Sequence, residues 1–139
     1  MQSYINATQE QGKEFYLKFH NKGKVVMLNL LRFKAEADYS NHPDLAPAAP
    51  ISGEAAYQIY MKETLPFLKE AGSKVLFYGE SKAFLIGPQE ESWDRVLLVE
   101  HESVTKFMAF AQNQAYLKIA GHRTAALEDS RLLPISQIK

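Results

Sequence analysis

A long apolar run occupies residues 24–33 and has the length of a β-strand. Both alternating faces of this run, KVVMLNLLRF, carry large apolar side chains, so neither face is expected to meet bulk water. Asn29 interrupts the run at its centre. Because a buried amide without a partner costs about 1–3 kcal/mol, Asn29 is expected either to pin neighbouring backbone or to belong to a site.

The remaining pattern predicts alternating helices and strands. Helical spacing or capping residues predict helices over residues 6–21, 53–71 and 114–128, the first with an Asn6–Gln9 capping box. A further helix is predicted after Ser103 as its N-cap, with apolar positions from Val104 to Ala111. Pro66 is expected to kink or break the second helix. Further strands are predicted at 74–80, 83–87, 93–101 and 131–135. Residues 34–52 form a long irregular segment, either an ordered lid or arm or a disordered excursion.

After the first helix the order is β-α-β-β-α-β. This order predicts an α+β, ferredoxin-like fold, with helices on one face of a four-stranded antiparallel sheet. The chain is read as a single domain over 1–139, with an N-terminal helical extension at 1–23 and the core at 24–139. The other sheet face would be open and apolar, which favours a homodimer that packs sheet against sheet.

Composition excludes several classes of partner and chemistry. Sixteen basic and sixteen acidic residues cancel, so neither nucleic acid nor a membrane surface is expected as a partner. The absence of cysteine removes disulfides, thiolate nucleophiles and thiolate metal sites. The four histidines show no metal-ligand spacing, and no phosphate-binding glycine loop occurs. Neither a signal peptide nor a membrane-length apolar run is evident, so a cytoplasmic protein without a cofactor is expected.

Several short strings carry a family resemblance: MLNLLRF (27–33), SGEAAYQIY (52–60), IGP (86–88), WD (93–94) and HRTAAL (122–127). Together they resemble longer members of the family called domain of unknown function 1330, over about residues 24–135. That family is similar to the dimeric α/β-barrel superfamily, which shares the ferredoxin-like plan. Residues 101–102 and 113–115 depart from the family pattern and put local loop shape in doubt.

The resemblance implies a homodimer and a pocket, either between sheet and helices or inside the barrel that two sheets form. It does not supply a reaction, because the superfamily includes cofactor-free monooxygenases, isomerase-like enzymes, haem proteins and sensory domains. A shared fold of this kind therefore does not identify the reaction that a member catalyses.

Three residues are candidates for catalysis. His122 and Arg123 offer a base near neutral pH and an anion-binding group, although neighbouring helical positions point about 100° apart and a surface pair is an equal alternative. Asp94 is a general base if burial raises its pKa, or a structural partner of a loop or of an arginine.

Five residues are candidates for ligand binding. Each has a structural alternative: Asn29 as a backbone pin, Arg32 in a surface ion pair, and the tyrosines in simple core packing. The candidates are Asn29, Arg32, Tyr57, Tyr60 and Trp93.

Two functions remain open on the sequence. The first is a cofactor-independent enzyme, oxygenase- or isomerase-like, acting on a small apolar or aromatic molecule. The second is a non-catalytic dimeric module that binds a small ligand or only assembles, since packing explains every candidate residue.

Overall fold

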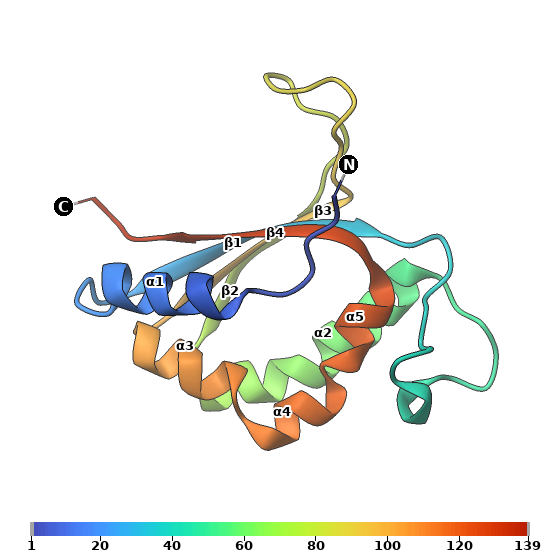
Figure 1. The fold of residues 1–139 in the computed structure, drawn as a ribbon, viewed down its shortest axis with the longest axis horizontal. Helices are drawn as coiled ribbons and strands as arrows, with labels where there is room; N and C mark the ends of the chain where they lie inside the picture. The colour runs from blue at the N-terminus through green and yellow to red at the C-terminus, as the bar shows by residue number, and fades with distance from the viewer. Residues whose placement is uncertain (1, 139) are drawn as a thin grey trace.

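A computed structural model of the protein describes residues 2–138 and contains one antiparallel sheet of four strands. The strand order is β2-β3-β1-β4, which confirms the ferredoxin-like plan. Figure 1 shows the helices below one face of the sheet and a projecting arm above the other. The strands are β1 (Val25–Phe33), β2 (Lys74–Glu80), β3 (Arg95–His101) and β4 (Leu127–Ile135). The helices are α1 (Gln9–Phe19), η1 (Pro43–Leu45), α2 (Gly53–Glu70), α3 (Val104–Ala111), α4 (Gln114–Ile119) and α5 (Gly121–Ala126).

Odd-numbered and even-numbered residues of β1 point to opposite faces of the sheet, and the helices cover only one of these faces. Leu31 is fully buried in a core that α2, α4 and α5 largely supply, whereas Val25 is fully buried in a smaller cluster with residues of α1 and α3. The even-numbered residues of β1 lie on the opposite face and are only partly buried. The sheet therefore has one filled face and one open face, as alternation along a strand requires.

Helix α1 begins later than the predicted residue 6. Thr8 is its N-cap, since the Thr8 hydroxyl accepts from the Gln11 N–H and the Gln11 side chain accepts from the Thr8 N–H, both at 3.1 Å. The predicted Asn6–Gln9 capping box is therefore wrong. Residues 2–7 are non-helical and pass beside β4, where the Tyr4 N–H donates to Asp129.

The helix predicted over 114–128 is instead two short helices followed by a strand. The chain turns at Ala120, and Gly121 packs so tightly that a Cβ there would lie 2.6 Å from the His42 ring. Strand β4 then starts at Leu127, four residues earlier than the predicted 131, because Leu127–Ser130 pair with the end of β1. The backbone pairing of residues 127–130 with β1 therefore determines their conformation, although Leu127 continues the helical spacing of the residues before it.

Two further predictions are corrected. Helix α2 continues through Pro66, which lies on the solvent side of the helix, where water can satisfy the Lys62 carbonyl that loses its N–H partner.

Residues 83–87 do not form a strand. Residues 81–94 project as an arm closed by a single Ala83–Ser92 bridge, and Leu85 at its tip is 99% exposed.

The segment 34–52 is ordered by backbone hydrogen bonds to the rest of the core. The Asp38 N–H donates to the Ala125 carbonyl at 2.9 Å, and the Lys34 N–H donates to the Ala126 carbonyl at 2.8 Å. The sequence left open an ordered lid or arm and a disordered excursion, and the structure supports an ordered segment.

Gly53→Ala is expected to destabilise the fold by about 3 kcal/mol, because backbone atoms that cannot move aside surround this position. A Cβ there would lie 2.3 Å from the Lys34 carbonyl oxygen and 2.6 Å from that of Ala126. Gly12→Ala in α1 is the matched control, since its Cβ would meet nothing within 4 Å and should stabilise the helix. Urea unfolding measures both, and equal stabilities would contradict the prediction.

Candidate functional site

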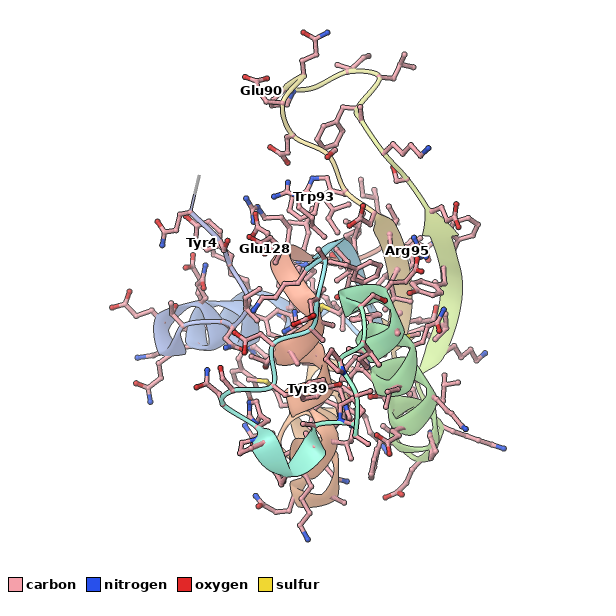
Figure 2. All side chains as sticks on the ribbon, turned by 90° about the vertical axis from the view of Figure 1, so that its right-hand side faces the viewer. Tyr4, Tyr39, Glu90, Trp93, Arg95 and Glu128 are labelled. Atoms are coloured by element: carbon pink, nitrogen blue, oxygen red, sulfur yellow. The ribbon has the colours of Figure 1, made fainter. Side chains whose placement is uncertain are left out.

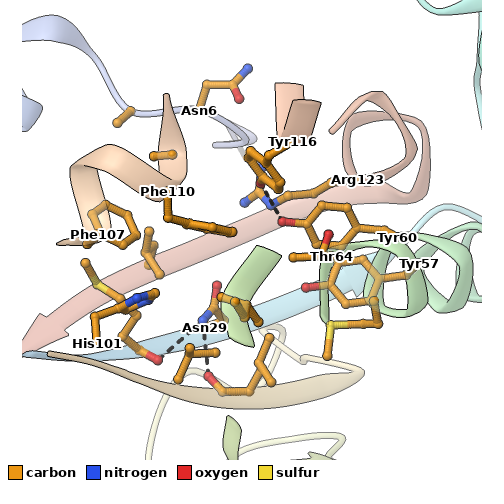
Figure 3. A pocket seen from close by; sticks show the side chains of 18 of the residues that line it. Asn6, Asn29, Tyr57, Tyr60, Thr64, His101, Phe107, Phe110, Tyr116 and Arg123 are labelled. Carbon is orange, nitrogen blue, oxygen red and sulfur yellow. Dashed lines mark hydrogen bonds between the residues drawn. The ribbon is translucent and has the colours of Figure 1, made fainter. Parts of the chain in front are cut away.

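The candidate site is a pocket of about 200 Å³ between the covered face of the sheet and the helices (Figure 3). Strands β1 and β3 form its floor, and α2 and the α3–α4 region form its walls. The segment before α1, Arg123 of α5 and Leu132 of β4 complete the lining. Most of the lining is apolar, with a few polar groups. These polar residues are Asn6, Asn29, Tyr57, Tyr60, Thr64, His101, Tyr116 and Arg123.

Helix α2 supplies one end of the pocket because Tyr57, Tyr60 and Thr64 recur at helical spacing on its buried face. The Tyr60 and Tyr116 hydroxyls hydrogen-bond each other at 2.6 Å. The Thr64 hydroxyl oxygen is buried and has no hydrogen-bond partner within residues 2–138. Burial raises the pKa of Tyr57 and of Tyr116, so both phenols stay protonated at neutral pH and remain donors.

Arg123 brings a positive charge to the same end of the pocket. Its guanidinium donates to the Ile5 carbonyl at 2.7 Å and to the Ser130 hydroxyl at 3.4 Å. Arg32, Arg95 and Arg131 each pair with a carboxylate. Within the described chain no carboxylate lies in ion-pair range of Arg123, so its charge is left uncompensated.

Asn29 lies on the floor of the pocket. Its side-chain nitrogen donates to the carbonyls of Leu97, at 3.2 Å, and of Met27, at 3.4 Å. Two carbonyl acceptors fix the orientation of the amide, which leaves its oxygen free to accept. Asn29 therefore pins the strands and also faces the pocket, combining the two roles that the sequence left as alternatives.

His101 lies on the pocket lining at the end of β3, across Asn29 from the tyrosines (Figure 3). Its Nδ1 is 2.7 Å from the Ser73 hydroxyl, which leaves Nε2 as the ring nitrogen available to a ligand. The ring packs edge-on against Phe107 at 4.9 Å between centroids. Burial lowers the pKa of His101 to about 4, so the imidazole is neutral near pH 7.

Two predicted catalytic residues lie outside the pocket lining. His122 is held between the Tyr39 hydroxyl, 2.7 Å from Nδ1, and the Glu63 carboxylate, 3.2 Å from Nε2, where it anchors the 34–52 segment. Asp94 accepts from the Phe33 N–H at 2.8 Å and so holds the end of β1. A catalytic role for either residue stays a prediction.

Neither Arg32 nor Trp93 lines the pocket, and Figure 2 shows Trp93 at the base of the arm. The Arg32 guanidinium stacks 4.8 Å from the centroid of the Trp93 ring and donates to the Ser92 carbonyl. The Trp93 N–H donates to the Glu91 carboxylate, and the ring is buried. Of the eight predicted site residues, the pocket brings together Asn29, Tyr57, Tyr60 and Arg123.

Four polar lining residues were absent from the sequence candidates: Asn6, Thr64, His101 and Tyr116. Leu97, Val99 and His101 alternate along a strand that was predicted, so their side chains point to the same buried face of the sheet. This alternation could have identified His101 as a lining residue. Thr64 follows Tyr57 and Tyr60 on the same helical stripe. Tyr116 carried no such signal, because its helix was predicted as one long element.

The fold and the pocket define a small ferredoxin-like protein with a ligand-sized hollow between its sheet and helices. The family described as domain of unknown function (DUF1330) matches residues 47–135, and the chain belongs to this family. A crystal structure of a protein of unknown function from Rhodopseudomonas palustris is 33% identical, with 99% of each chain covered and a TM-score of 0.87.

A second solved structure is similar in fold alone. It is described as a putative antibiotic biosynthesis monooxygenase from Caulobacter crescentus CB15, with 8% identity, coverage of 91% of this chain and 99% of that chain, and a TM-score of 0.55. None of the curated proteins matches the sequence. Among residues 2–138, no helix combines the length and the apolar character needed to cross a bilayer.

Proposed function

We propose that the protein binds a small apolar or aromatic molecule in this pocket and acts on it without a cofactor, in an isomerase- or oxygenase-like reaction. One observation carries the proposal: the pocket is lined by the buried face of α2, where the Thr64 hydroxyl has no hydrogen-bond partner among residues 2–138. An unpaired buried hydroxyl costs about 1–3 kcal/mol, and a bound ligand that accepts from it would recover part of that cost.

The chemistry of the lining supports proton transfer. A reaction of the isomerase kind needs a neutral base and donors for developing negative charge. His101 is such a base, and the phenol of Tyr57 and the hydroxyl of Thr64 are such donors. The fold likeness to the Caulobacter protein supports the oxygenase form only by analogy.

Filling the pocket is expected to abolish ligand binding. Ala111 of α3 lines the pocket, so Ala111→Leu should occupy part of its volume, whereas Ala109→Leu on the exposed side of α3 is the matched control. A thermal-shift screen of single-ring compounds should give hits with the wild type and with Ala109→Leu that disappear with Ala111→Leu. Hits that survive Ala111→Leu, or a wild type that binds nothing, would reject the proposal.

A dimeric assembly module is the second candidate, and the open face of the sheet favours it. Four apolar residues stand opposite one another across all four strands: Phe77, Leu98, Leu28 and Leu133. Two of them remain well exposed, Phe77 at 60% and Leu133 at 58%. We name these four residues the apolar row, and an exposed apolar row of this length is typical of an interface.

A second copy of this chain is the occupant that we propose for the apolar row. Homodimers use the same patch twice, so a continuous apolar row is complementary to itself. The arm at 81–94 rises on the same side of the sheet (Figure 1) and presents Leu85 and Ile86, which are exposed at its tip. A partner sheet on the open face would lie beside this arm and give its apolar tip a surface to contact.

A further inference from the structure

We propose that the ligand of the pocket is a small monocyclic acid, with its carboxylate at the Arg123 end and a hydroxyl group directed toward Asn29 and His101. The inference rests on the proposed binding function and names the chemical class of its ligand. Neither the family nor the similar structures assign such a ligand.

The charge of the pocket favours an anion. Arg123 is its only arginine or lysine, and within residues 2–138 it has hydrogen bonds to neutral oxygens but no carboxylate in ion-pair range. The other groups at that end are hydroxyls, which do not neutralise a cation. An anionic oxygen placed there gains a charge-assisted hydrogen bond in partly desolvated surroundings.

The hydroxyls around Arg123 point to the same conclusion. Thr64 lacks an acceptor, and the structure records no acceptor for the Tyr57 hydroxyl among the described residues. Tyr60 and Tyr116 share one hydrogen bond between two hydroxyls, so one of these protons is left over. A carboxylate has two oxygens with about four acceptor positions, which matches an end built of unsatisfied donors.

The other end of the pocket offers acceptors instead. The oxygen of Asn29 is free because both amide protons go to strand carbonyls, and Nε2 of a neutral His101 either accepts or donates according to its tautomer. Figure 3 places His101 and the tyrosines on opposite sides of Asn29. A ligand that spans the pocket would therefore present acceptors at one end and a donor, such as a phenolic hydroxyl, at the other.

The size of the pocket limits the body of the ligand. An apolar cavity of about 150 Å³ holds one benzene molecule, so a pocket of about 200 Å³ has room for a single ring with short substituents. The side chains that would contact the ring are aromatic or aliphatic, with Phe107 and Phe110 on the walls and Leu97 on the floor. Such side chains favour an aromatic or unsaturated ring over a sugar or a polar chain.

Calorimetric titration with three probes, namely benzoate, benzamide and 4-hydroxybenzoate, tests the inference. Benzamide has nearly the same shape as benzoate but carries no charge. The wild type should bind benzoate at least about tenfold more tightly than benzamide, and 4-hydroxybenzoate more tightly still. Arg123→Gln should remove the preference for benzoate, while Lys118→Gln, which alters an exposed cation of α4, should keep it.

Thr64→Val separates a binding role from a structural one. The variant keeps the shape of the side chain and removes the hydroxyl that has no partner, so the melting temperature of the free protein should rise. Its affinity for benzoate should nevertheless fall about tenfold. This variant also keeps the inference testable if Arg123→Gln loosens the N-terminal segment that Arg123 holds through Ile5.

The outcomes distinguish the inference from the proposed function. Equal binding of benzamide and benzoate, blocked by Ala111→Leu, would overturn the acid and leave the pocket as a binding site. An unchanged affinity of Thr64→Val for benzoate would overturn the carboxylate position. If no probe binds the wild type, both the acid and the single-ring site are rejected.

Discussion

Leu28→Glu is expected to convert the proposed homodimer into a monomer. Leu28 lies at the centre of the apolar row, directly opposite Leu98 on β3 and Leu133 on β4. Two-fold symmetry would bury two new carboxylates without partners, and each costs several kcal/mol. The dimer dissociation constant should therefore rise by about a thousandfold or more.

Sedimentation at micromolar concentration measures this change in mass. Leu65→Glu is the control, because Leu65 is an exposed leucine that lies on α2, away from the open face of the sheet. The control should remain a dimer. A wild type that is a monomer in dilute solution, or a Leu28→Glu variant that keeps the wild-type mass, would contradict the proposed interface.

His101→Gln is expected to remove much of the acid sensitivity of the fold. The folded pKa of His101 is lowered to about 4 from the ordinary 6.5, because burial disfavours the charged ring. The unfolded chain consequently binds the extra proton first, and stability falls as the pH drops from about 6.5 toward about 4. From the size of the shift, the wild type should lose about 2–3 kcal/mol over this window through His101 alone.

Urea unfolding at about pH 7.5 and about pH 4.5 measures the effect. The quantity compared is the loss of unfolding free energy between the two conditions, so any packing cost of the glutamine cancels. His20→Gln, at an exposed position after α1, should show the same loss as the wild type. If His101→Gln also shows the full wild-type loss, the protonation of His101 does not govern acid stability.

Strand alternation and helix stripes were sufficient to predict most of the architecture. The alternation of apolar residues in β1 and the helical spacing of Tyr57 and Tyr60 in α2 each arise within a single element. Both patterns can therefore be recognised in the sequence. The conformation at the end of the 114–128 stretch could not be predicted from local sequence. There, pairing of Leu127–Ser130 with β1 decides the conformation, and the partner strand lies about a hundred residues away.

The site was predictable only in part for a similar reason. Asn29, Tyr57 and Tyr60 stand out as polar groups within apolar elements, and they do line the pocket. Asp94 and Trp93 stand out equally, yet their partners are the Phe33 N–H and the Glu91 carboxylate. Sequence spacing identifies polar groups that need partners, whereas only the fold determines which of them already have one.

Two-dimensional NMR of the isotope-labelled protein during titration with 4-hydroxybenzoate tests the central claim most directly, because it shows where a ligand binds. The account predicts shifts concentrated at the Asn29 side-chain amide, the Thr64 backbone amide and the His101 ring, all of which line the pocket. Shifts confined to the open face of the sheet, or none at all at saturating concentrations of the probe, would contradict it.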